Sequence, residues 1–446
     1  MKKLAALGAL LALAAGAWLA LRDRRPTGFI LISIDTLRAD HLGAYGYPLD
    51  TSPFFDEFSE RGTLFTNAIV QLPGTLPSHM SIFTGLYPAE HGVYPPDSVL
   101  SPEIRTLPEA FQAAGYRTAG FTEGGYVAGH YGFERGFDTF RAVNTGKPGA
   151  AGRTFDLVRD WIDTLEEGDK FFVFVHTYEV HDPYIAMEPF GRNSWPGEPP
   201  DTWEPTGANL TAASLGELPV TPEAVRYFGA LYDAGIRYVD EVLRGFMEHL
   251  WAADLARDTT VIITSDHGEE FLEHGSFVHR QVYNETLHVP LLIRRLGQRR
   301  GARVSRLVQS VDLAPTLLDL AGIRRSGMTP SGTSLVPLLR GARQATGAEA
   351  YAEGMSVPTR TLYRQTDSGL YQLLLTREGD ESVRRELYRL DDDPRQQKDL
   401  APRRSALVRE LEAALERYRW DVKANAGRAE LSEEQTDRLK ALGYLQ

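Results

Sequence analysis

Runs of apolar residues alternate with longer amphipathic segments along the chain. Residues 28–34, 171–175 and 259–264 are dominated by apolar side chains at consecutive positions, whereas residues 154–167 and 222–250 repeat them at helical spacing. Strands that are apolar on both sides are typical of a parallel sheet covered by helices on both faces. The alternation of such strands with helices predicts a doubly wound α/β domain.

The pattern changes after Gly341. Residues 362–378 and 386–390 alternate as antiparallel strands do, and helical patterns follow at residues 405–418 and 431–442. This change predicts a main domain over residues 27–343 and a small antiparallel-sheet subdomain with tail helices over residues 344–446. The proline-rich stretch from Pro189 to Pro222 is either a surface excursion near a site or an ordinary loop.

The first 25 residues have the composition of a targeting segment. Lys2 and Lys3 precede an uncharged run from Leu4 to Leu21, with small residues before Trp18. This arrangement predicts either a cleaved signal peptide or an uncleaved membrane anchor. We therefore expect export to the periplasm or to the outer face of the inner membrane.

Composition excludes several classes of partner and chemistry. The net charge of −12 argues against nucleic acid as the main partner, because phosphate binding needs clustered cations. The absence of cysteine removes disulfides, thiolate nucleophiles and Cys-ligated zinc.

Chemistry-bearing side chains follow all three predicted strands: Asp35, the segment 176–181, and Asp266 with His267. A single Asp after a strand is usually the N-cap of the next helix. In a doubly wound sheet, however, ligands bind beyond the carboxyl ends of the strands. Several such strand ends together therefore predict a site at this edge.

The segment from Thr75 to Gly85 reads TLPSHMSIFTG. It resembles the signature of the sulfatase family, in which a Cys or Ser is followed by x-Pro-Ser-Arg and, further on, by an apolar residue and Thr-Gly. The residues in register with that signature are Pro77, Ser78, Phe83, Thr84 and Gly85. Thr75 stands at the position of the nucleophile, and His79 stands at the position of the arginine.

The resemblance continues through residues 35–41, 176–184 and 265–279. It implies an alkaline-phosphatase-like core, with a mostly parallel sheet between helices, as a sulfatase-like catalytic domain over 27–343. Carried over residue by residue, it implies a metal site formed by Asp35, Thr75, Asp266 and His267. It further implies that Thr75 is the nucleophile, and that His181 and His279 bind the oxyanion and protonate the leaving group.

The implied metal shell contains two carboxylates, a hydroxyl and an imidazole. This mixture of oxygen and nitrogen favours zinc or manganese, while calcium and magnesium fit it less well. Glu179 is an alternative ligand for a second metal, with His181 and His279. His176 and His274 either support the site or serve the core.

Three positions depart from the sulfatase pattern. Thr36 stands where many sulfatases have a second Asp, and His79 replaces an arginine that would clamp an anion. Sulfatases also oxidise their Cys or Ser to formylglycine, an aldehyde. Because Thr75 is a secondary alcohol, it cannot form an aldehyde at that carbon. We therefore expect no formylglycine, and a covalent phosphothreonine intermediate in its place.

The function predicted from these residues is metal-dependent hydrolysis of phosphate or phosphonate esters by Thr75. Three alternatives stay open: a sulfuric ester hydrolase, a phosphotransferase acting on an envelope lipid or glycan, and a non-catalytic binding protein on the same fold. All but the last require an anionic ester as substrate.

Overall fold

The computed structural model describes residues 26–143, 148–195, 197–342, 347–379, 382–418 and 426–441. The leader predicted over residues 1–25 lies outside them. Within these ranges, no helix is long and apolar enough to cross a membrane.

A nine-stranded mixed sheet forms the centre of the described chain, with the order β11-β2-β10-β7-β1-β6-β4-β5 and β12 paired to β2. Its strands are β1 (Gly28–Ile34), β2 (Thr63–Ile69), β4 (Arg117–Thr122), β5 (Thr139–Ala142), β6 (Phe171–Thr177), β7 (Thr259–Thr264), β10 (His288–Arg294), β11 (Ala302–Val304) and β12 (Val308–Gln309). Strand β1 runs parallel to both β6 and β7, whereas β10 is antiparallel to β7 and β2. The mostly parallel sheet is confirmed.

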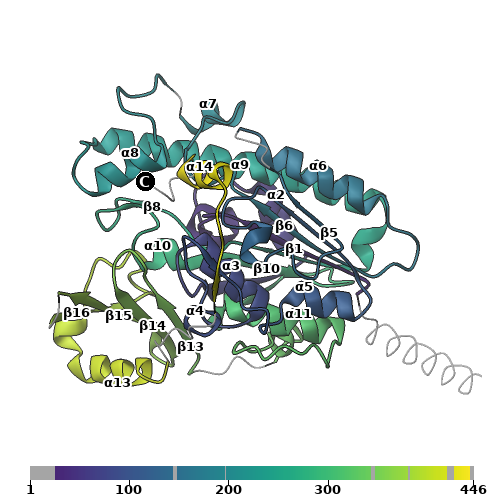
Figure 1. The fold of residues 1–446 in the computed structure, drawn as a ribbon. Helices are drawn as coiled ribbons and strands as arrows, with labels where there is room; N and C mark the ends of the chain where they lie inside the picture. Colours follow the sequence, from purple (N-terminus) through teal and green to yellow (C-terminus); the bar gives the residue numbers. More distant parts are fainter. Residues whose placement is uncertain are drawn as a thin grey trace, which may run out of the picture.

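Helices cover both faces of this sheet (Figure 1). On one face lie α2 (Pro53–Ser59), α6 (Ala150–Ile162) and α9 (Pro222–Ala252). On the other lie α3 (Thr75–Thr84), α5 (Leu107–Ala113) and α11 (Leu313–Ala321). The helical patterns predicted at residues 154–167 and 222–250 correspond to α6 and α9.

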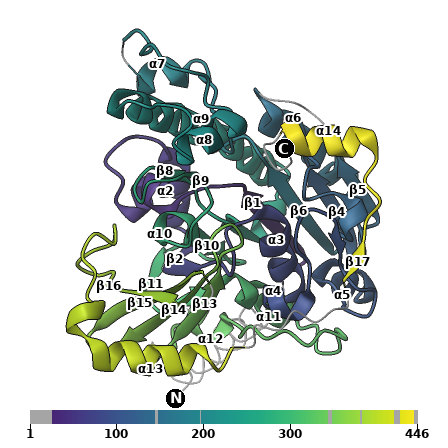
Figure 2. The same cartoon turned by 60° about the vertical axis from the view of Figure 1, so that its left-hand side comes forward.

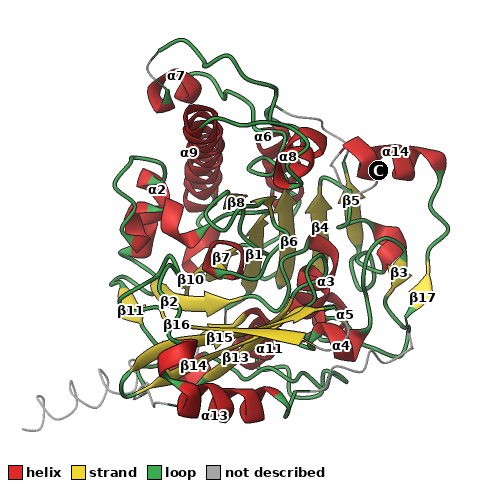
Figure 3. Ribbon diagram, turned by 90° about the vertical axis from the view of Figure 1, so that its left-hand side faces the viewer, coloured by secondary structure: helices red, strands yellow, loops and turns green. Residues whose placement is uncertain are grey.

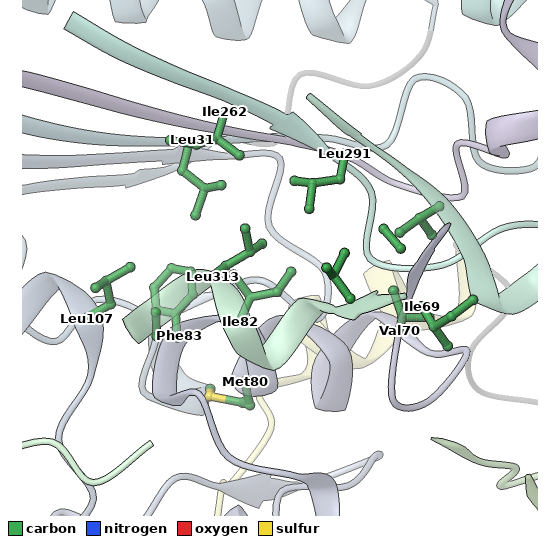
Figure 4. Close-up of a cluster of buried hydrophobic side chains, with 14 of the residues drawn as sticks. Leu31, Ile69, Val70, Met80, Ile82, Phe83, Leu107, Ile262, Leu291 and Leu313 are labelled. Carbon is green, nitrogen blue, oxygen red and sulfur yellow. The ribbon is translucent and has the colours of Figure 1, made fainter. Parts of the chain in front are cut away.

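Consecutive residues of β1 point alternately to the two faces of the sheet. Ile30 and Ile32 pack with α6 and α9, whereas Phe29 and Leu31 pack with α3 and α5, and all four are fully buried. Figure 4 shows Leu31 and Ile262 of neighbouring strands facing Phe83 and Leu313. Because burial of one such side chain contributes roughly 1.5–3 kcal/mol, these two layers hold the strand ends in place.

A second, antiparallel sheet packs against the main domain, with α13 (Ser405–Leu415) on its other side (Figure 3). Its order is β13 (Glu349–Glu353), β14 (Thr359–Thr366), β15 (Gly369–Glu378) and β16 (Ser382–Arg389). These strands confirm the antiparallel pattern predicted after Gly341.

The last described segment returns to the central sheet (Figure 2). Strand β17 (Gly427–Arg428) pairs with β3 (Ser98–Val99), and α14 (Glu433–Ala441) follows. Leu439 of α14 is 2% exposed and belongs to the core cluster of the central sheet. The tail therefore packs against the main domain, whereas α13 packs against the small sheet.

Short elements make up the connections between these layers. They are α4 (Pro88–His91), α7 (Phe190–Ser194), α8 (Gly207–Ser214), α10 (Asn284–Leu287), α12 (Val336–Leu339), β8 (Glu270–Phe271) and β9 (Phe277–Val278).

Candidate active site

Three predicted metal ligands meet at the carboxyl ends of β1 and β7. These strands pair in parallel with Ser33 opposite Thr264, so the residues that follow them emerge at the same edge. One ligand atom from each of Asp35, Asp266 and His267 lies within 4.8 Å of the others, and all three residues are fully buried.

The His267 ring is oriented to offer a lone pair to this cluster. Its Nδ1 lies 2.9 Å from the carbonyl oxygen of Gly268, which requires Nδ1 to carry the proton and donate it. Nε2 is then an acceptor, and it lies 3.4 Å from Asp266 Oδ2. A backbone carbonyl that fixes the tautomer in this way is a common support for a metal-binding histidine.

The carboxylates fit a cation. Asp35 Oδ1 and Asp266 Oδ2 are buried and have no hydrogen-bond donor among the described residues. Burial raises the pKa of Asp35 to about 7, and burial together with the charge of Asp35 raises the pKa of Asp266. Two buried carboxylates without a counter-charge are costly, so the donor set is that of a divalent metal site.

Thr75 begins α3 and faces these ligands. Its Oγ1 donates to Asp35 Oδ2 at 3.3 Å and lies 3.4 Å from His267 Nε2. The Ser78 hydroxyl donates to the Asp266 carbonyl at 2.6 Å, which ties the first turn of the helix to the loop after β7. Thr75 is 1% exposed and β-branched, so its hydroxyl has little rotamer freedom.

His79 takes a structural position in place of the arginine of the sulfatase signature. Its Nδ1 donates to the Thr75 carbonyl at 2.8 Å, and its Nε2 accepts from the Ser33 hydroxyl at 2.9 Å. Burial lowers its pKa to about 3, so the ring is neutral. His79 thus links α3 to β1 and brings no permanent charge to the site.

His279 and His181 line up beside the metal ligands. The His279 ring centroid lies 4.3 Å from that of His267, and the His181 centroid lies 5.5 Å from that of His279. Nδ1 of His279 is 3.3 Å from Glu269 Oε1, and Nδ1 of His181 donates to the Asp182 carbonyl at 2.9 Å. Burial lowers the pKa of His279 to about 4. His279 therefore lies beside the cluster and lines the pocket, whereas His181 lies behind it in contact with the His279 ring.

Thr36 adopts a left-handed backbone conformation, with φ of 58°. Its carbonyl accepts from the Tyr232 hydroxyl at 2.7 Å, and its amide donates to Asp266 Oδ1 at 3.4 Å. This conformation is unfavourable for a β-branched residue, and such strain gathers at functional sites. In the sequence, Thr36 stands where many sulfatases have a second Asp. The periodicity of the chain gave no sign of its left-handed backbone conformation.

The structure separates the remaining histidine and glutamate candidates. His176 Nε2 contacts Asp35 Oδ2 at 3.1 Å, so it supports the site. His274 instead pairs with Glu285. Glu179 accepts from the amides of Gly149 and Ala151, at 3.0 and 2.8 Å, at the start of α6. Both oxygens of Glu179 are thus used in capping a helix.

A pocket of about 420 Å³ opens beside Thr75 and His279. Helix α8, from the proline-rich stretch, contributes Gly207 and Thr211, so this stretch is an excursion near the site. The C-terminal subdomain contributes Met355 and Ser356. The other lining residues are Pro73, Gly74, Leu76, Pro77, Pro95, Pro96, Tyr126, Asp182, Val278 and Arg280.

This geometry agrees with comparisons to known proteins. The family described as "Sulfatase" matches residues 28–323, most of the chain. The chain belongs to the sulfatase family. A second description, "N-sulphoglucosamine sulphohydrolase, C-terminal", matches residues 272–421. The protein is therefore a sulfatase-family hydrolase. Enzymes of this family bind a divalent metal, and the Asp35–Asp266–His267 cluster is the candidate site for one.

Two curated relatives carry sulfatase names. A Delta 4,5-hexuronate-2-O-sulfatase of Bacteroides thetaiotaomicron is 27% identical over 434 residues, covering 87% of this chain and 88% of that protein. Human Arylsulfatase K is 28% identical over 331 residues, covering 64% of this chain and 61% of that protein.

Solved structures show the same fold for this sulfatase-family chain. A 2-O GAG sulfatase superposes with a TM-score of 0.68 at 23% identity, covering 89% of this chain and 92% of the other. A phosphonate monoester hydrolase of Agrobacterium radiobacter gives 0.67 at 20% identity, covering 88% and 96%. One fold thus serves enzymes named for sulfate esters and for phosphonate esters.

Proposed function

We propose that this sulfatase-family hydrolase cleaves phosphate or phosphonate esters with the Thr75 hydroxyl as its nucleophile. The observation that carries the proposal is the position of Thr75 Oγ1, 3.3 Å from Asp35 Oδ2 and 3.4 Å from His267 Nε2, at the start of a helix. The helix start places partial positive charge beside the hydroxyl, which favours an anionic ester.

The residues of the site support a double displacement. Thr75 Oγ1 forms a bond to phosphorus while the bond to the leaving oxygen breaks, and water then attacks the phosphothreonine and regenerates the hydroxyl. A divalent ion held by Asp35, Asp266 and His267 would lower the pKa of a nearby hydroxyl and screen the anion. The hydrogen bond from Thr75 to Asp35 aligns the attacking oxygen.

His279 is the residue that we assign to proton transfer, with His181 beside it. A bound anionic ester and the carboxylate of Glu269 both favour the protonated ring, so substrate binding raises its pKa from the low value set by burial. The ring then gives its proton to the leaving oxygen and takes one from the attacking water in the second step.

For the metal we propose zinc or manganese. The described cluster offers two carboxylates and one imidazole, with the Thr75 hydroxyl beside them, and calcium and magnesium prefer shells of oxygen alone.

Sulfate ester hydrolysis is the second candidate, favoured by the sulfatase names of the curated relatives. Against it, Thr75 cannot form the aldehyde whose hydrate releases sulfate in formylglycine sulfatases. A plain sulfothreonine has no comparably easy route to hydrolysis, whereas phosphorus accepts in-line attack by water. We also propose that the protein acts outside the cytoplasm, because residues 1–25 have the composition of an export signal.

The test compares 4-nitrophenyl phosphate, phosphonate and sulfate esters at one pH and with one metal. We expect a phosphorus ester to turn over at least about tenfold faster than the sulfate ester, a difference of roughly 1.4 kcal/mol in the barrier. Thr75→Ala should remove turnover by several orders of magnitude, while Thr75→Ser should retain part of it.

Thr84→Ala provides the matched control. Thr84 is a buried threonine at the other end of the same helix, and its hydroxyl donates to the Met80 carbonyl at 2.6 Å. It should keep near wild-type activity. A clear preference for the sulfate ester, or full activity of Thr75→Ala, would overturn the proposal.

A further inference from the structure

The pocket beside Thr75 has one permanently charged cation among the described residues that line it, Arg280. His279 also lines the pocket, but its ring lies beside His267 at the reacting centre. The two buried aspartates would balance a divalent ion. If a substrate carries a second negative charge, Arg280 is therefore the remaining positive charge in the pocket that can bind it.

Arg280 is held by its backbone and not by an ion pair. Its amide donates to Glu270 Oε2 at 2.8 Å, which fixes the chain beside β8. Within the described ranges, no carboxylate lies within ion-pair distance of its guanidinium. Arg280 nevertheless belongs to the lining of the pocket that opens beside Thr75, next to His279 in the chain.

Burial separates Arg280 from the reacting centre. Asp35, Asp266 and His267 are fully buried, and Thr75 is 1% exposed, so the ester group must enter to the bottom of the pocket. Arg280 lines the same pocket but is partly exposed, so it is nearer to solvent than these buried groups. It is therefore placed to meet the leaving group and not the ester being cleaved.

Part of the pocket wall is apolar. Tyr126 and Pro96 belong to the main domain, and Met355 projects from the C-terminal subdomain with 41% of its surface exposed. A ring-shaped leaving group can pack on such a wall with one edge turned toward Arg280.

We propose that Arg280 is a specificity-determining residue, which binds an anionic substituent such as a carboxylate on the leaving group. The proposal rests on the ester hydrolysis argued above and names the class of substrate: esters whose leaving group carries its own negative charge. A guanidinium suits this role because it binds a carboxylate with two parallel hydrogen bonds.

The experiment uses the ester class that the wild-type protein cleaves fastest, in two forms. One is the 4-nitrophenyl ester, and the other carries an added carboxylate on the ring. We expect wild-type kcat/KM to favour the carboxylated ester, and Arg280→Ala to reduce that preference at least tenfold, mainly through KM. Arg280→Lys should retain an intermediate preference. Arg299→Ala, an exposed arginine outside the pocket, should leave the preference unchanged.

Three outcomes contradict this role. Equal losses on both esters would place Arg280 at the reacting group. If Arg280→Ala kept both the preference for the carboxylated ester and the wild-type melting temperature, Arg280 would have no part in recognising the leaving group. A wild-type preference for the neutral ester would exclude the substrate class. Failure of the proposed function looks different, because the wild-type protein would then cleave neither ester through Thr75.

Discussion

At the scale of single residues, the site has a neutral histidine where the sulfatase signature has a permanently charged arginine. His79 fills the arginine position of the sulfatase signature and is fully buried between α3 and β1. His279 is likewise neutral in the free protein. We expect such a site to bind an anion through the metal, the helix start and histidines that become protonated, so its affinity for anions should depend strongly on pH.

Metal removal should destabilise the protein, because Asp35 and Asp266 then share a buried site without a counter-charge. We expect about one divalent ion per chain after purification, a lower melting temperature in chelator, and recovery with zinc or manganese. Asp266→Asn should melt higher than the wild type without metal, since a buried charge is gone, and should respond little to added ion.

Asp312→Asn is the control for this experiment. Asp312 is a buried carboxylate outside the site that accepts from the amides of Gln309 and Thr333. Its variant should keep the full response to metal. Selective recovery with calcium would contradict the ligand set.

Because His91 is buried as a neutral ring, we expect the protein to lose stability in acid. His91 is fully buried, its Nδ1 accepts from the Val93 amide at 3.1 Å, and burial lowers its pKa to about 3. Between that value and the unfolded pKa of about 6.5, the unfolded chain binds the extra proton. Stability therefore falls as pH drops through this window, by up to about 1.4 kcal/mol per pH unit from this residue.

The measurement is urea unfolding between pH 4 and 7. His91→Gln should lose this part of the slope, because glutamine cannot take up a proton. His249→Gln, a substitution on the partly exposed face of α9, should retain it. Identical slopes in the wild type and His91→Gln would contradict the argument.

Sequence reasoning found the candidate ligands that follow strands but not the contacts that surround them. Asp35, Asp266 and His267 could be predicted because parallel strands bring their carboxyl ends to one edge. The contact of Glu269 with His279, and the left-handed backbone of Thr36, depend on packing between distant segments. Neither carries a periodic signal in the sequence.

At the scale of elements, helix α3 connects the active site to the hydrophobic core. Its first residue is Thr75, all ten of its residues are buried, and it ends at Gly85 with φ of 70°. The Gly85 carbonyl also accepts from the Ser331 amide at 2.8 Å. The geometry of this cap sets how far the helix can reach toward the metal ligands.

Gly85→Ala should therefore be costly. A Cβ at this position would lie 2.5 Å from Pro330 Cβ, in addition to the strain of a positive φ. Gly115, which follows α5, has a φ of 78°, and a Cβ added there would meet nothing within 4 Å. We expect Gly115→Ala to cost about 1–2 kcal/mol and Gly85→Ala about 1–3 kcal/mol more, by urea unfolding. Equal losses of stability in the two variants would show that Pro330 can move away from the added Cβ at no cost.

Element type was easier to predict than element direction. The apolar runs at residues 28–34, 171–175 and 259–264 became β1, β6 and β7, as expected. The run at 289–294 has the same composition, yet β10 is antiparallel to β7 and β2. A strand that is buried on both faces looks alike in either direction, so its direction depends on the connections before it.

At the scale of the whole molecule, the two sheets are less independent than the change of pattern after Gly341 indicates. The small sheet contributes Met355 to the wall of the active-site pocket. The tail then leaves that sheet and returns to the main domain, where Gln435 contacts His130 at 3.0 Å and Leu439 enters the core. Composition identified the second sheet, but it could not indicate where the tail would pack.

The return of the tail has a consequence for synthesis in the cell. The segment that pairs with Ser98–Val99 leaves the ribosome more than three hundred residues later, after every strand of both sheets. Until then the place that Leu439 fills stays open, and His130 lacks its contact with Gln435. The nascent chain can complete both sheets while this part of the core is still open, so a chain that stalls late would be folded in bulk and yet less stable than the full chain.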